Sequence, residues 1–164
     1  MAANKQYKPD ILHSYITCYF QPEIDTLTII LKITLCGCYV ELHITANNSS
    51  GQITLNQSNA LSVFVSLDAG GGSGIDADWW LAAYTPSGWY YYVYPDQWYY
   101  ASVLQDILPA YQGPLFDLSP LEILNITQLP VGAYTVYFGV DLNRNGIIDF
   151  DQLYLNSIGI NVVP

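Results

Sequence analysis

The sequence predicts an all-β protein built as an antiparallel β-sandwich. Apolar and polar residues alternate with a period of two over most of the chain, which is typical of strands with one buried face. Runs of Gly, Pro, Asn and Ser separate the alternating segments at short intervals, and only residues 102–108 suggest a helical turn. We therefore expect an immunoglobulin-like or jelly-roll-like arrangement.

The first 45 residues are expected to contain a strand over 10–20 and a hairpin over 26–45. Cys36-Gly37 would form the hairpin turn, which places Lys32 opposite Glu41 on the solvent face. The polar run 47–51 follows. Residues 1–45 are thus either part of the same sandwich or the end of a preceding module.

Residues 46–164 are expected to form an acidic sandwich rich in aromatic side chains. The alternation predicts strands over 61–67, 79–84, 89–94, 121–125, 134–140 and 153–162. Glycine and proline turns lie between them.

The net charge of −10 comes from 4 Lys and Arg against 14 Asp and Glu. Beyond Thr45, one arginine accompanies ten acids. So few cations exclude binding to a phosphate backbone, and hence to nucleic acid. No apolar stretch approaches the roughly 18 residues of a membrane-spanning helix, so membrane insertion is not expected.

The three cysteines are Cys18, Cys36 and Cys38. The last two lie too close for an ordinary disulfide. We expect small buried apolar side chains with at most one disulfide, and the redox state stays open.

The most specific motif is the segment 141–152, DLNRNGIIDFDQ. Oxygen-bearing side chains occupy its positions one, three, five and nine, and a glycine occupies position six. Calcium takes six to eight oxygen ligands, and this spacing lets one tight loop supply most of them. The alternative is an Asn-Gly hairpin turn with solvated acids and no metal.

This segment resembles the calcium loops of EF-hands, dockerins and thrombospondin type 3 repeats. The resemblance implies that Asp141, Asn143, Asn145, Asp149 and the carbonyl of Ile147 are Ca²⁺ ligands. At position twelve Gln152 replaces the expected acid, so Asp151 is the favoured closing ligand. The segments on both sides of the loop are predicted to be strands. The three formal charges of Asp141, Asp149 and Asp151 suggest a dissociation constant for Ca²⁺ of roughly 10⁻⁴–10⁻³ M.

From about residue 61 to residue 162, the chain resembles uncharacterised β-sandwich modules of large secreted or surface-anchored bacterial proteins. The resemblance is carried by DWWLAA at 78–83, GWYYY at 88–92, YQGPLF at 111–116 and YTVYFGVD at 134–141. It implies an extracellular or cell-surface location and no particular activity. Because residues 1–10 are too polar to open a signal peptide, an export signal is expected outside this chain.

Eleven aromatic residues lie between Trp79 and Tyr100. Exposed Trp and Tyr rows stack on sugar rings and anchor protein contacts, so a ligand-binding platform is one interpretation. Its candidate residues are Trp79, Trp80, Trp89, Trp98 and Tyr91. The alternative is that these side chains only cover a sandwich poor in charged residues.

Three further acids, Asp68, Asp76 and Asp78, surround the glycine run 70–74. A second cation site is one interpretation, but acids at the end of a Gly-rich loop are expected to be solvated. His13 and His43 have no accompanying nucleophile pattern, so no catalytic set is predicted.

The sequence thus predicts a calcium-stabilised structural or adhesive module of an extracellular or surface protein, and not an enzyme. A carbohydrate-binding module is the alternative, and a hydrolytic enzyme domain comes third. The expected partner is a polysaccharide, a protein or a copy of the chain itself.

Overall fold

The computed structural model describes residues 40–95 and 97–164. The chain divides into two compact units, of which the second runs from Cys38 to Pro164 and contains everything described below. The predicted strand 10–20, the first strand of the predicted hairpin and the three cysteines lie outside the described residues.

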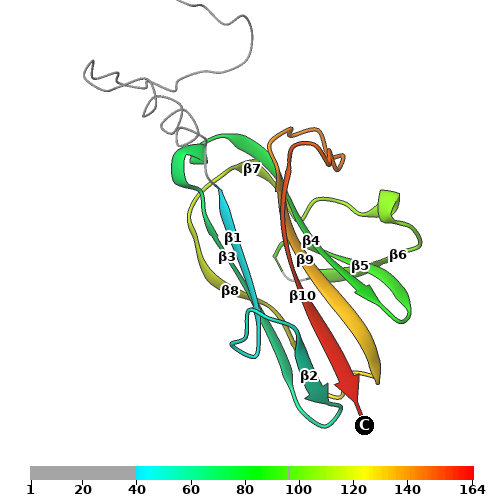
Figure 1. The fold of residues 1–164 in the computed structure, drawn as a ribbon. Helices are drawn as coiled ribbons and strands as arrows, with labels where there is room; N and C mark the ends of the chain where they lie inside the picture. Colours follow the sequence, from blue (N-terminus) through cyan, green and yellow to red (C-terminus); the bar gives the residue numbers. More distant parts are fainter. Residues whose placement is uncertain (1–39, 96) are drawn as a thin grey trace, which may run out of the picture. The chain divides into compact units, whose positions relative to one another are not determined.

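The described residues form two β-sheets (Figure 1). In the smaller sheet the strand order is β1 (Glu41–Ala46), β3 (Leu61–Asp68) and β8 (Leu118–Ile126). The larger sheet has the order β2 (Ile53–Asn56), β10 (Leu153–Val163), β9 (Gly132–Asp141), β4 (Asp76–Thr85), β5 (Gly88–Val93) and β6 (Gln97–Ala101), with β7 (Tyr111–Pro114) also paired to β4. All pairs are antiparallel except β2 with β10. The predicted all-β antiparallel sandwich is confirmed.

One hydrophobic core lies between the two sheets. Strand β3 contributes alternate residues from Leu61 to Leu67, all of them buried, as the period-two pattern predicts. The larger sheet supplies Phe138 and Val140 from β9 and Ile158 and Ile160 from β10, which belong to the same buried cluster. The sheets are also joined at their edges, because Trp98 donates its Nε1–H to the carbonyl of Ile123 at 3.1 Å.

Strand β1 pairs with β3 along its whole length, so residues 41–45 belong to the sandwich. The polar run 47–51 is therefore a loop inside one domain. Asn47 stabilises this loop, because its Oδ1 accepts the Ser62 N–H at 2.8 Å and its Nδ2 donates to Ala60 O at 3.0 Å. In this register Glu41 lies opposite Asp68.

Three short strands, β2, β6 and β7, are absent from the sequence prediction. The predicted helical turn at 102–108 is only the 3₁₀ helix η2 (Leu104–Asp106), and a second such turn, η1 (Gly70–Gly72), lies in the glycine run. Within the part of the chain that the structure describes, no helix has the length and hydrophobicity required to cross a bilayer.

Strand β4 is buried on both faces from Ala77 to Ala82. Its inner face joins the main core, whereas Trp80 and Ala82 on its outer face pack with Ala101 and Ile107 in a second cluster. The loop between β9 and β10 contributes Ile148 to this cluster. The loop therefore lies against the outer face of the larger sheet, at the end of the sandwich opposite the C-terminus (Figure 1).

Substitution of a buried and an exposed phenylalanine tests the assignment of the core. Phe138 is 1% exposed, and its replacement by Ala should lower the free energy of unfolding by about 3–5 kcal/mol, because it leaves a cavity between the sheets. The control Phe150→Ala removes a side chain that is 70% exposed and should change stability by less than about 0.5 kcal/mol. Urea unfolding of both variants measures the difference, and equal effects would contradict the assignment of the core.

Candidate metal centre

The segment 141–152 lies between two strands, as predicted: Asp141 ends β9 and Leu153 opens β10. Asp141 is completely buried. Its Oδ1 accepts the N–H of Asn143 at 2.9 Å, and its Oδ2 accepts the N–H of Asp149 at 2.7 Å. One carboxylate thus joins the two ends of the loop.

Three of the predicted ligand side chains converge on one point. The Nδ2 groups of Asn143 and Asn145 lie 2.5 Å and 2.9 Å from Oδ2 of Asp149. The Oδ1 atom of Asn145 accepts the N–H of Ile147 at 2.7 Å, which fixes the direction of that side chain. The loop therefore concentrates carboxylate and amide groups at a single place.

The other two predicted ligands are arranged differently. The Ile147 side chain is exposed, and only its backbone is directed by Asn145. Asp151 is exposed at the far end of the loop. Among residues 40–95 and 97–164, no three Asp, Glu, His or Cys side chains form a cluster able to hold a metal ion, so a cation at this loop would depend on amide and backbone oxygens as well.

Asp78 on β4 also belongs to the site. The sequence predicts that this acid is solvated, and that prediction is wrong. It lies directly opposite Asp141 in the β4–β9 register and, like Asp141, is completely buried. Its Oδ2 accepts the N–H groups of Asn145 at 3.0 Å and Gly146 at 2.5 Å, and its Oδ1 accepts Nε2 of Gln112 at 2.7 Å. Asp78 shares a strand face with Trp80, which is also buried, but spacing in the sequence does not show that this face is covered.

The other two acids of that group are indeed at the surface. Asp76 is exposed and forms an ion pair at the surface, in which its Oδ2 lies 3.4 Å from Nη1 of Arg144. Asp68 is exposed and accepts the N–H of Gly70 at 2.9 Å. Among the described residues these three acids do not form a group able to hold a metal ion.

The electrostatics of the buried pair are unusual. Two carboxylates directly opposite one another on adjacent strands have Cβ atoms about 5 Å apart, and like charges in this position repel. Within the described residues neither Asp78 nor Asp141 takes part in an ion pair. From residue 40 onward the sequence contains a single cationic side chain besides histidine, Arg144, and it pairs with Asp76. Backbone and side-chain N–H groups are the partners that the structure gives these two charges.

The proposed aromatic platform is divided between two faces of the larger sheet. Trp79 and Trp98 belong to the main core, whereas Trp80, Trp89 and Tyr91 belong to the outer cluster. Trp79 and Trp80 are both buried, and neither indole N–H has a hydrogen-bond partner among the described residues. These two rings serve as apolar packing, so the four tryptophans do not share one surface.

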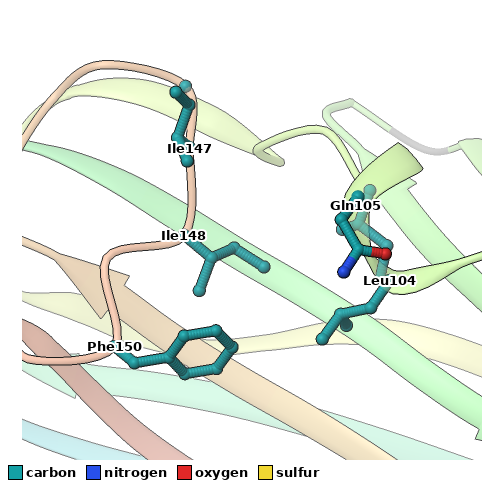
Figure 2. A pocket seen from close by; sticks show the side chains of 7 residues that line it. Leu104, Gln105, Ile147, Ile148 and Phe150 are labelled. Carbon is teal, nitrogen blue, oxygen red and sulfur yellow. The ribbon is translucent and has the colours of Figure 1, made fainter.

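An apolar groove of about 150 Å³ lies on the outer face beside the loop. Trp80, Trp89 and Tyr137 line it from the sheet, and Ile148 and Phe150 line it from the loop. An adjoining hollow of similar volume lies between the loop and η2, where Ile148 and Phe150 point toward Leu104 (Figure 2). The loop therefore forms one wall of both hollows.

Comparisons with known proteins add a structural likeness. No family model and no curated protein matches this chain. Among solved structures, the chain is similar to the CARDB domain of a protein from Pyrococcus furiosus, which was solved in complex with di-metal ions. The TM-score is 0.39 with 15% sequence identity, over 76% of this chain and 88% of that one.

The role of the outer-face tryptophan can be tested by substitution. Trp80→Ala should lower the free energy of unfolding by about 3–5 kcal/mol, because the side chain is only 4% exposed and packs in the outer cluster with Ala101 and Ile107. Tyr84 lies on the same face of β4 but is 51% exposed, so Tyr84→Ala is the matched control and should cost much less. Denaturant unfolding compares the two, and a mild effect of Trp80→Ala would show that its ring is not part of a packed cluster.

Proposed function

We propose that this chain provides a calcium-stabilised β-sandwich module with a structural or adhesive role in an extracellular or cell-surface protein. The observation that carries the proposal is the convergence of Asn143, Asn145 and Asp149 on one point of the loop. The motif alone predicts these residues as ligands. Their convergence supports one common ion.

The donor chemistry fits a hard cation such as calcium. Carboxylate and amide oxygens are its preferred ligands. Both asparagines present Nδ2 to Asp149 in this structure, so binding an ion there would require them to turn their amide oxygens toward it. Asp141, Asn143, Asn145, Asp149 and the Ile147 carbonyl would hold the ion, with Asp151 as the closing ligand. A bound ion would supply the positive charge that the buried pair of Asp78 and Asp141 does not receive from any ion pair among the described residues.

A structural role follows from where the loop lies. It covers the outer face of β4 through Ile148, so a cation that orders the loop also orders the cover of the sheet. Exposed aromatic side chains at Tyr84 and Tyr99 on the same sheet support an adhesive contact. The carbohydrate-binding alternative loses its four-tryptophan platform, because Trp79 and Trp98 face the core.

Calcium should raise the melting temperature of the protein, and EDTA should reverse the change. With a dissociation constant of roughly 10⁻⁴–10⁻³ M, 10 mM Ca²⁺ stabilises the folded state by about 1.4–2.7 kcal/mol, which corresponds to a rise on the order of 5–10 °C. Differential scanning calorimetry with and without EDTA measures the shift.

The variant Asp149→Ala should abolish this shift, because it removes the oxygen on which both asparagines converge. Glu122→Gln is the charge-matched control on β8 of the smaller sheet and should keep the full response. A wild-type melting temperature that ignores both calcium and EDTA would refute the calcium proposal.

A further inference from the structure

We infer that Asp78, which lies outside the twelve-residue loop, is the positioning residue that sets the calcium affinity of that loop. The inference rests on the proposed function and adds a residue that the motif does not contain. It starts from the position of Asp78 on β4, directly opposite the first residue of the loop.

The Asp78 carboxylate holds the tip of the loop by its backbone. Its Oδ2 accepts two successive N–H groups, from Asn145 at 3.0 Å and from Gly146 at 2.5 Å. Gly146 has a φ of +76°, a left-handed conformation that glycine adopts without strain. Two consecutive N–H groups turned toward one anion form a concave backbone site, and here a protein carboxylate fills it.

This anchor acts on the proposed ligands through Asn145. With its N–H held by Asp78, Asn145 reaches Asp149 through Nδ2 at 2.9 Å and accepts the N–H of Ile147 through Oδ1 at 2.7 Å. The ligand positions five, seven and nine of the motif are thus linked to one fixed point on the sheet. Without the Asp78 carboxylate the loop would adopt other conformations. Calcium would then bind only the fraction of molecules in the binding conformation, and its apparent affinity would fall.

Asp78 is itself oriented and shielded. Gln112 on β7 donates to its Oδ1 at 2.7 Å, so both carboxylate oxygens have N–H partners. Hydrogen bonds to a charged acceptor are about twice as strong as neutral ones, and complete burial removes the competition of water. Asp78 lies outside the motif, and its Oδ2 is shared by two backbone N–H groups of the loop. It is therefore assigned the role of positioning the loop, not that of a ligand.

The test is a calcium titration of the whole chain by isothermal calorimetry, at a temperature where every variant is fully folded. Asp78→Ala should weaken calcium binding by about 10-fold or more, the loss typical of residues that orient metal ligands. Asp78→Asn keeps the shape and one acceptor, and should show a smaller loss; it replaces the Ala variant if that one does not fold. Gln112→Ala should also give a smaller loss, because Asp78 remains.

The matched control separates positioning from general stability. Trp98 packs against the main core, whereas the loop contributes to the second cluster through Ile148. Trp98→Phe removes the hydrogen bond between Trp98 and Ile123 and should lower stability without changing calcium affinity. Hydrogen exchange of calcium-free protein gives a second readout: the Asn145 and Gly146 amides should be protected in the wild type and should exchange faster in Asp78→Ala.

The outcomes are distinguishable. If the wild type binds calcium and Asp78→Ala binds it equally well, the positioning role is overturned and the proposed function stands. If the wild type binds no calcium, both fall, even where the exchange data show that Asp78 anchors the loop. Weaker binding in Asp78→Ala together with unchanged binding in Trp98→Phe supports the inference.

Discussion

The placement of two buried carboxylates opposite one another on adjacent strands governs the rest of this structure. Burying an ionised carboxylate is costly unless hydrogen bonds or a counter-charge replace the lost water. Asp78 and Asp141 obtain hydrogen bonds from the backbone of the loop that follows β9, so the loop must fold back over the outer face of the sheet. The conformation of the loop and the burial of the two acids therefore depend on each other.

That folded-back loop also explains the shape of the larger sheet. An antiparallel sheet in a sandwich commonly leaves its outer face to solvent. Here Ile148 from the loop and Ile107 from the segment after η2 join Trp80 and Ala82 in a second apolar cluster. The central strand consequently reads as a continuous buried run from Ala77 to Ala82, with none of the alternation that marks β3.

The sequence was informative where a pattern is local. The long strands β3, β9 and β10 were predicted because alternation over many residues identifies a half-buried strand. Strands β2 and β7 have four residues each, too few to show a period. The loop was placed correctly by its motif, since turn chemistry is encoded in neighbouring residues.

The part of the site outside the motif could not be predicted in this way. That Asp78 faces Asp141 depends on the register between β4 and β9, a long-range pairing that residue spacing does not encode. The same limit applies to the tryptophans. Alternation required Trp79 and Trp80 to point in opposite directions, but the burial of Trp80 depends on the cover supplied by distant residues such as Ile107.

The hydrogen bond from Gly146 to Asp78 spans 68 positions of the chain. Residues so far apart are brought together by the pairing of β4 with β9, which offsets the entropy of closing the intervening chain. The twelve-residue segment in a nascent or unfolded chain therefore lacks its anchor, however complete its set of oxygen atoms. Order in the loop depends on the assembled sandwich, and a peptide of these twelve residues alone would lack the acceptor that holds its Asn145 and Gly146 amides.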